Sequence, residues 1–255
     1  NTLELEKNLI FPAVYRKLFL KMASYTINKS DILRAVSSST EEQALSFDPS
    51  KRVVRFPAWV DFEIFSKVQA SRSDEKDFKI LFIGSVTDRK KPHLIVEAIN
   101  KIKNKDIKLY VVGPTPNENY LSQLKELVHN YDLEDQVLFT GSVDRNSVMD
   151  HYADTNLMIL PSVSEGLARV IFESQATACP VLVTDAPGMG DIVIDGQTGY
   201  IFESDNLESL TNKIQEIINN YNDAVHVGNN AKDFILSNYS ADNFKFSFKK
   251  IFDTV

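Results

Sequence analysis

The chain has 255 residues and a formal net charge of −7, a length that fits one large domain or two small ones. The acidic balance argues against general nucleic-acid binding, which needs a basic surface, and no secretory signal or apolar run of transmembrane length appears. The single cysteine, Cys179, cannot form an internal disulfide, so we expect a small buried residue in a protein of the reducing cytoplasm.

The first predicted element is a basic, amphipathic helix from Lys7 to Lys21 that Pro12 interrupts. Such a helix could rest on an anionic membrane surface, or it could pack inside a domain. We favour packing, because neither its length nor its charge distinguishes the two. The chain begins at Asn1 rather than Met, which suggests a processed or truncated product.

The next segment is expected to hold two short strands around one helix. The pattern predicts a strand that leads into a helix cap at residues 30–37, a helix opened by capping-box residues 38–42, and a second strand at residues 51–57. A polar break follows at residues 71–77.

Beyond this break, strands alternate with helices. The predicted strands are Lys79–Ile83, Leu109–Val112, Val137–Thr140, Asn156–Leu160, Val181–Thr184 and Tyr200–Phe202. The predicted helices are Pro92–Lys103, Tyr120–Tyr131, Ser147–Ala153, Leu167–Ala178, Leu207–Asn220 and Ala224–Ser237. Such alternation implies right-handed βαβ crossovers and therefore an α/β fold with a parallel, doubly wound, Rossmann-like sheet.

One strand–loop–helix stretch carries the strongest functional signal. The apolar run Leu157–Leu160 suits a strand covered on both faces, and Pro161 ends it. Ser162 and Ser164 are candidate caps of the helix predicted at Leu167–Ala178. Ligands of open α/β sheets bind where such strands end, and the N–H groups and dipole of a helix N-terminus favour a phosphate there.

Two carboxylates flank this predicted phosphate position. Glu165 lies in the loop, and Glu173 lies six residues or so into the helix, which is roughly 9 Å along its axis. That is about the reach of a diphosphate with a sugar at each end, so one carboxylate can meet a sugar and the other can take both hydroxyls of a ribose. For two isolated acids, a capping residue and a solvated helix residue would be the simpler interpretation.

The surrounding residues favour the functional interpretation. Glu165 and Glu173 stand within Ser-Glu-Gly-Leu-x-Arg-Val-x-x-Glu, which resembles the donor-site signature of the retaining GT-B glycosyltransferases of family 4. Further matches follow in the family's order, at the loops of residues 82–92, 111–114 and 139–143 and the glycine-rich segment 180–202. Two departures are Ala58-Trp59, where the family usually has Asn-Gly, and Asp191, where it commonly has Glu.

The resemblance implies an enzyme of two facing Rossmann-like domains, of which this chain holds the donor-binding one. We expect residues 1–61 to be a remnant of the N-terminal acceptor domain with its linker, residues 62–240 the donor domain, and residues 241–255 a C-terminal helix. The rest of the N-terminal half, which usually supplies the acceptor site, would have to come in cis or in trans.

The resemblance also assigns roles to residues. Glu165 would be the catalytic residue that contacts the transferred sugar, and Glu173 would bind the ribose. The expected donor-binding residues are Gly84, Ser85, Lys90, Gly113, Ser142, Val143, Gly166, Leu167, Ala168, Arg169, Val170 and Glu173.

The loop after Gly84 departs from the family pattern at one position. Lys90 matches the lysine that holds the donor diphosphate, whereas Ser85 replaces the arginine that does so. Arg89 or Lys91 could compensate for that loss.

The implied activity is transfer of a hexose from a UDP- or GDP-linked nucleotide-sugar to a glycan or lipid-linked acceptor, with retention, in cell-envelope or exopolysaccharide synthesis. We expect no cofactor and no metal ion, because no Asp-x-Asp pair or His/Cys cluster with metal-ligand spacing occurs. The expected location is the cytoplasm, including peripheral contact with the inner face of the membrane. The alternatives are a non-catalytic nucleotide-binding partner subunit and, less favoured by the arrangement of its acids, a GT-B epimerase.

Overall fold

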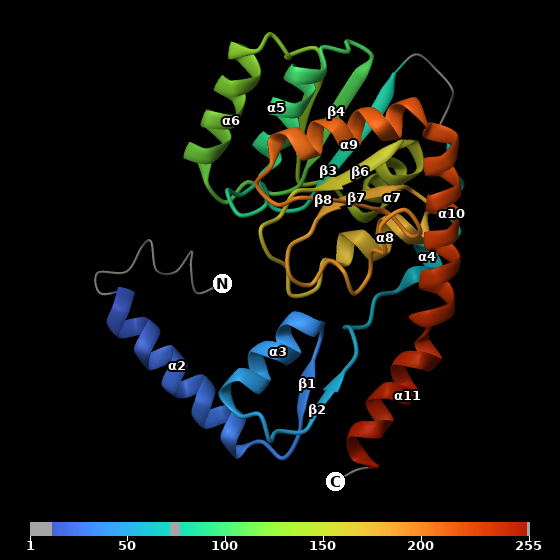
Figure 1. Cartoon of the computed structure of the whole chain (residues 1–255). Helices are drawn as coiled ribbons and strands as arrows, with labels where there is room; N and C mark the ends of the chain where they lie inside the picture. Colours follow the sequence, from blue (N-terminus) through green and yellow to red (C-terminus); the bar gives the residue numbers. More distant parts are fainter. Residues whose placement is uncertain (1–11, 72–76, 254–255) are drawn as a thin grey trace. The chain divides into compact units, whose positions relative to one another are not determined.

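The computed structural model describes residues 12–71 and 77–253 (Figure 1). The chain divides into two compact units. The larger unit runs from Trp59 to Asn243, and the smaller one combines the residues up to Ala58 with those from Phe244 onward.

A six-stranded parallel sheet forms the centre of the larger unit, in the order β5-β4-β3-β6-β7-β8 (Figure 1). Its strands are β3 (Phe78–Ile83), β4 (Ile107–Val112), β5 (Val137–Gly141), β6 (Leu157–Leu160), β7 (Val181–Thr184) and β8 (Tyr200–Phe202). Every residue of β6 and β7 is buried, as expected for parallel strands covered on both faces. The predicted doubly wound sheet is therefore confirmed, with strand ends that shift by one or two residues.

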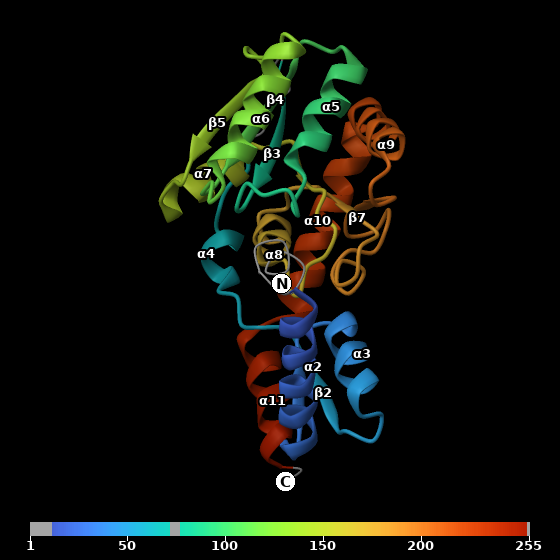
Figure 2. The same ribbon diagram turned by 90° about the vertical axis from the view of Figure 1, so that its left-hand side faces the viewer.

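The helices of this unit cover the two faces of the sheet. They are α4 (Phe62–Ser66), α5 (Pro92–Ile102), α6 (Glu118–Asn130), α7 (Arg145–Asp154), α8 (Arg169–Ala176), α9 (Leu207–Asn219) and α10 (Tyr221–Asn238). The chain steps outward from β3 to β5 through α5 and α6, then returns through α7 and α8, so right-handed crossovers place these two pairs on opposite faces. Helix α9 packs against α5, whereas α10 and α4 pack against α8 (Figures 1 and 2).

Local sequence explains where these helices begin. Asn117, Asp144 and Asn206 cap α6, α7 and α9, because each side chain accepts a hydrogen bond from a backbone N–H of the first turn. Helix α5 starts at Pro92, whose fixed φ suits the first helical position. Cys179 is fully buried, as predicted.

The smaller unit contains two parallel strands, β1 (Leu33–Ala35) and β2 (Val53–Arg55), and the helices α2 (Pro12–Lys29) and α3 (Ser38–Phe47). It also takes in helix α11 (Ala241–Phe252) from Phe244 onward. The Phe56 ring lies edge-on to the rings of Phe244 and Phe248, with centroids 5.6 and 6.4 Å apart, and the Arg34 guanidinium lies 4.4 Å from the Phe56 centroid. This aromatic cluster joins the C-terminal helix to the strand pair.

The predicted capping box of α3 is present, with Ser37 as the N-cap and Thr40 as its partner. The described part of the predicted helix is α2, whose first described residue is Pro12 and which continues to Lys29, beyond the predicted end at Lys21. The part of the predicted helix before Pro12 lies outside the described residues. Within the described chain, we find no helix both long and apolar enough to cross a membrane.

Candidate functional site

The predicted site residues lie on four loops at one edge of the six-stranded sheet, because the carboxyl ends of parallel strands meet there. Gly84, Ser85 and Lys90 follow β3, and Gly113 follows β4. Ser142 and Val143 lie between β5 and α7. The remaining residues lie between β6 and α8 or in α8 itself: Glu165, Gly166, Leu167, Ala168, Arg169, Val170 and Glu173.

The ends of β3 and β4 approach each other closely at two glycines. Gly84 and Gly113 have φ values of +135° and +136°, which L side chains rarely adopt. A Cβ atom on Gly113 would lie 2.1 Å from the Gly84 carbonyl oxygen. A Cβ atom on Gly84 would lie 3.0 Å from the Lys90 Nζ, so the Lys90 ammonium lies directly over the backbone of Gly84.

Glu165 is the centre of a small cluster of charges. Its Oε1 lies 3.1 Å from Lys90 Nζ and 3.2 Å from an Arg89 guanidinium nitrogen, which also donates to the Ser164 carbonyl oxygen at 2.5 Å. The side chains of Lys90 and Glu165 are only 12% and 10% exposed. The structure therefore brings together the predicted catalytic acid and the predicted phosphate-binding lysine, and it adds Arg89 to them.

Ser162 supports this cluster in a way that differs from its predicted role. The Ser162 hydroxyl donates to Glu165 Oε1 at 2.9 Å, and the Ser162 carbonyl accepts from Thr184 Oγ1 at 2.7 Å. The predicted caps are wrong: Ala168 is the N-cap of α8 and makes no side-chain cap bond. Helix α8 begins at Arg169, two residues later than predicted, because the loop is held by contacts with its neighbours rather than by caps.

Glu173 lies in the second turn of α8, against α7. Its Oε2 accepts a hydrogen bond of 3.2 Å from the Tyr152 hydroxyl, and the Tyr152 side chain is fully buried. Burial raises the pKa of Glu173, while the Tyr152 hydrogen bond and the positive charges of Arg169 and Arg145 oppose that rise. Nothing in the sequence spacing pointed to Tyr152, since it belongs to a different helix from Glu173.

The two residues proposed to replace the missing arginine behave differently. Arg89 joins the Glu165 cluster, whereas Lys91 forms an ion pair with Asp205. Ser85 is half-buried at the start of the same loop. Among the described residues, no side-chain hydrogen bond links Ser142 or Val143 to the Glu165 cluster, although their loop lies at the same sheet edge.

The glycine-rich segment after β7 forms successive turns, with Met189 N–H bonded to the Ala186 carbonyl and Ile192 N–H to the Met189 carbonyl. The Tyr239 hydroxyl donates to the Asp191 carbonyl oxygen at 3.2 Å, which anchors these turns to the end of α10.

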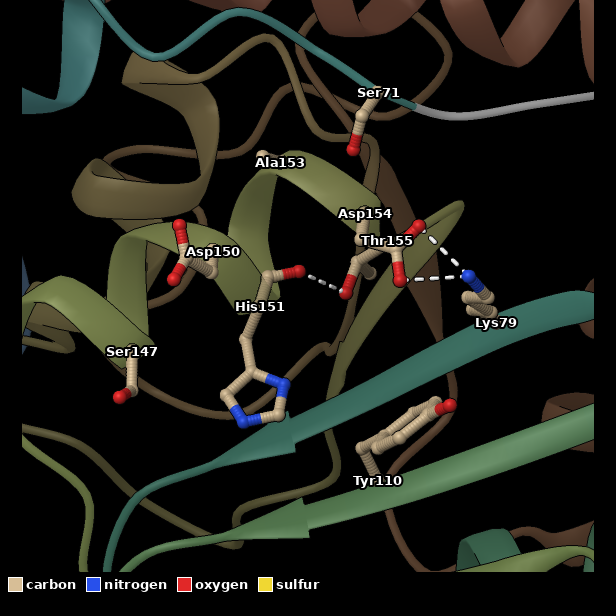
Figure 3. Close-up of a pocket in the computed structure, with 9 residues that line it drawn as sticks. All are labelled: Ser71, Lys79, Tyr110, Ser147, Asp150, His151, Ala153, Asp154 and Thr155. Carbon is tan, nitrogen blue, oxygen red and sulfur yellow. Dashed lines mark hydrogen bonds and ion pairs between the residues drawn. The ribbon is translucent and has the colours of Figure 1, made fainter.

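A separate pocket of about 370 Å³ lies beside α7 (Figure 3). Lys79, near the start of β3, pairs with both carboxylate oxygens of Asp154 there, and the rings of Tyr110 and His151 lie 5.8 Å apart. None of the predicted site residues lines it. The candidate site is therefore the loop edge around Glu165 and not this cavity.

The family can now be identified. A model of the family described as "Glycosyl transferases group 1" matches residues 63–234, which include every loop of the candidate site. The chain belongs to this family. The resemblance drawn from the Glu165–Glu173 signature is thereby confirmed.

Curated relatives agree with this membership. The chain is 25% identical over 199 residues to the capsular polysaccharide biosynthesis glycosyltransferase CapM of Staphylococcus aureus, covering 71% of this chain and 49% of CapM. It is 24% identical over 230 residues to a GDP-mannose-dependent α-(1-6)-phosphatidylinositol monomannoside mannosyltransferase of Mycobacterium tuberculosis, covering 84% of this chain and 59% of that protein. The chain thus spans about half the length of the curated relatives it matches.

A solved structure supports the fold. The structure of Anabaena Alr3699/HepE in complex with UDP and glucose superposes with a TM-score of 0.83, at 17% identity, over 92% of this chain and 67% of that one. At this identity the match establishes the GT-B-type fold and leaves the chemistry to be argued from the residues.

Proposed function

We propose that the chain is the donor-binding half of a retaining glycosyltransferase that takes a hexose from a UDP- or GDP-linked sugar. The observation that carries this proposal is the Lys90–Glu165 pair over Gly84, at the carboxyl end of β3. Such a site combines a cation for a diphosphate with a carboxylate for a sugar, and it needs no metal ion or other cofactor.

The diphosphate is the leaving group of the proposed reaction, so negative charge grows on it as the sugar departs. Lys90 can meet that charge with its ammonium, and the positive end of the α8 dipole can add to it. The absence of a side chain at Gly113 lets the ends of β3 and β4 approach each other, and its absence at Gly84 leaves room for the Lys90 ammonium.

Glu165 would change partners when the donor binds. In the free site its carboxylate balances Lys90 and Arg89. An incoming diphosphate offers these cations a stronger anion, which would release Glu165 toward the sugar hydroxyls. Arg89 would then supply the second positive charge that Ser85 does not, and Glu173 would accept the ribose hydroxyls at the far end of the donor.

The acceptor side is proposed from the relatives. CapM is named for capsular polysaccharide biosynthesis, and the mycobacterial protein for mannosylation of a phosphatidylinositol mannoside. We therefore propose a glycan or lipid-linked acceptor of the cell envelope, with peripheral contact at the inner face of the membrane. Because the chain spans about half of these relatives, we also propose that an N-terminal half, in cis or in trans, supplies the acceptor site.

Calorimetry with UDP-glucose and GDP-mannose tests donor binding by the 255-residue chain. We expect one of them to bind and Glu173→Ala to weaken it by about 10- to 100-fold, because charge-assisted hydrogen bonds to the ribose are lost. Lys125→Ala, on the exposed surface of α6, is the matched control and should bind like wild type. If neither nucleotide-sugar binds, the donor-site assignment is wrong.

Transfer is tested separately. The 255-residue chain should transfer no sugar on its own, and a family N-terminal domain, fused or added as a second chain, should restore transfer with retention at the anomeric carbon. Efficient turnover by the isolated chain would contradict the proposal that the acceptor half is required.

A second candidate function is a non-catalytic nucleotide-binding subunit. The observation that favours it is Ser85, which leaves the diphosphate site without the family's arginine. This candidate predicts donor binding that depends on Glu173 but no transfer with any N-terminal half, whereas the enzyme proposal predicts transfer that disappears in Glu165→Gln.

A further inference from the structure

The contact between α7 and α8 gives Glu173 a buried tyrosine hydroxyl as its hydrogen-bond partner. The Tyr152 hydroxyl, fully buried on α7, lies 3.2 Å from Glu173 Oε2 on α8. We propose that Tyr152 is a positioning residue of the donor site, whose buried hydroxyl fixes the Glu173 carboxylate in the orientation that receives the two ribose hydroxyls. This inference rests on the proposed function and names a residue that acts through Glu173 without touching the donor.

The surroundings hold the Tyr152 hydroxyl in place. Its ring packs edge-on against Phe65 of α4, with centroids 5.9 Å apart, and the Tyr152 hydroxyl oxygen also lies 3.3 Å from the Val170 carbonyl oxygen. A hydroxyl has one proton, and a charged carboxylate is a stronger acceptor than a peptide carbonyl. The proton therefore goes to Glu173 whenever Glu173 is ionised, and Val170 is the acceptor that remains when it is not.

The effect on Glu173 is to fix one oxygen and leave the other for the ligand. Among the described residues, no side chain donates a hydrogen bond to Glu173 Oε1. A ribose presents two adjacent hydroxyls, so it needs both oxygens of the carboxylate in a defined plane. The hydrogen bond from Tyr152 restricts the rotation of the Glu173 carboxylate. Oε2 keeps a second lone pair that can still accept a hydrogen bond from the ribose.

The Tyr152 hydroxyl affects the pKa of Glu173 more directly than the charged side chains around that acid. Burial raises the pKa of Glu173, and the Tyr152 hydrogen bond is the largest influence that opposes this, ahead of Arg169 and Arg145. Arg145 is also engaged by Asp61, 3.8 Å away, and lies 5.9 Å from the centroid of the Phe65 ring. On α10, the Lys232 ammonium donates to the Ser66 carbonyl oxygen. Tyr152 is thus the direct hydrogen-bond partner that favours the ionised form of Glu173 against the effect of burial.

The test is Tyr152→Phe, which keeps the ring and removes only the hydroxyl. Binding of UDP-glucose and GDP-mannose is measured by calorimetry from pH 5 to pH 8.5, with probes whose diphosphate diesters do not titrate in this range. Wild-type affinity should fall as pH drops, because the carboxylate becomes protonated. Tyr152→Phe should bind about three- to tenfold more weakly at pH 7, in line with one lost hydrogen bond to a charged group. As pH is lowered, its affinity should begin to fall at a higher pH than that of wild type.

Two controls separate this role from a merely structural one. Tyr120→Phe removes another buried tyrosine hydroxyl that bonds a titratable side chain, His93 Nδ1 at 2.7 Å, but it lies on the opposite face of the sheet. It should leave the pH profile unchanged. In a Glu173→Gln background, Tyr152→Phe should cause little further loss, because the acid on which it acts is gone.

The outcomes are distinguishable from those of the proposed function. If wild type binds neither nucleotide-sugar, the proposed function fails. If wild type binds and Tyr152→Phe has the same affinity and pH profile as Tyr120→Phe, then the positioning role is wrong while the donor site stands. A loss in Tyr152→Phe that persists undiminished in the Glu173→Gln background would equally overturn it.

Discussion

The two acids of the Glu165–Glu173 pair stand in contrasting environments. Glu165 lies in a loop, where two cations and a serine hydroxyl contact a single carboxylate oxygen. Glu173 lies on a helix against a buried tyrosine, and the arginines that influence it act without direct hydrogen bonds. The first acid has its charge balanced by neighbours that a diphosphate can take away, whereas the second has to be kept ionised within the packing of two helices.

This contrast suggests a division of labour. The Glu165 region is an ionic cluster that should respond to salt and to competing anions. The Glu173 region is a buried polar contact that should respond to pH and to the loss of one hydroxyl.

The largest expected effect comes from the backbone that supports the Glu165 region. Gly113→Ala should destabilise the fold by about 4 kcal/mol, because a Cβ atom there would lie 2.1 Å from the Gly84 carbonyl oxygen and φ is +136°. The measurement is urea unfolding. Gly141→Ala is the matched control, since its φ is +69° and no atom lies within 4 Å of the added Cβ, so it should cost only 1–2 kcal/mol or so. Equal losses in both variants would contradict the close approach of β3 and β4.

Lys90→Ala should remove the main cation of the diphosphate site. We expect nucleotide-sugar affinity to fall by about 10- to 100-fold, which corresponds to the loss of one charged hydrogen bond of roughly 1.5–3 kcal/mol. The affinity should also depend less on salt concentration, because one positive charge is gone. Arg89→Ala should cause a smaller fall in affinity, because the Arg89 guanidinium already donates a hydrogen bond to the Ser164 carbonyl and is less available to the diphosphate. If Lys90→Ala leaves the affinity and its salt dependence unchanged, the loop after β3 does not bind the diphosphate.

Much of this architecture was predictable from the sequence. The alternation of Leu157–Leu160 and its companion strands with amphipathic helices predicted the sheet, because burial on both faces leaves a continuous apolar run. The family signature and the shared edge of parallel strands predicted that Lys90 and Glu165 lie at the same end of the sheet, whereas their direct ion pair was seen only in the structure. Tyr152 could not be found this way, because its pairing with Glu173 depends on how α7 and α8 pack. The start of α8 was also misplaced, since Ser162, which looks like a cap, donates its hydroxyl to Glu165 instead.

Glu173→Gln should change stability and binding in opposite directions. Burial raises the pKa of Glu173 above its unfolded value, so at a pH between these two pKa values the native state keeps a proton that the unfolded chain has lost. The free energy of unfolding therefore falls as pH rises from the ordinary glutamate pKa to the raised pKa of native Glu173. Above the raised pKa, the full cost of burying the ionised carboxylate is present. The Gln variant should have a higher Tm than wild type at pH 8, with the difference shrinking toward pH 4, while nucleotide-sugar affinity falls by about tenfold. Glu134→Gln, at a fully exposed glutamate whose pKa is lowered by His129, should not be stabilised at pH 8.

Ser85→Arg is expected to have the smallest effect, and it tests whether the Glu165 cluster can accommodate a third positive charge. In the free site, one carboxylate already balances Lys90 and Arg89, and Lys91 is paired with Asp205. A third cation would be left unbalanced until a diphosphate arrives, so the free state should be less stable and the bound state relatively favoured. We expect UDP-glucose or GDP-mannose to bind about two- to fivefold more tightly at low salt, a gain comparable to one exposed ion pair, and the gain to vanish at high salt.

The reference for Ser85→Arg is Ser122→Arg, which adds the same charge on the exposed surface of α6. If both variants bind alike, the charge acts at long range and position 85 does not face the diphosphate. If Ser85→Arg binds more weakly at every salt concentration, then Arg89 already occupies the space of the family's arginine and the added side chain displaces it. Only tighter binding at low salt, absent from Ser122→Arg, agrees with a cluster in which Glu165 is the anion that the diphosphate replaces.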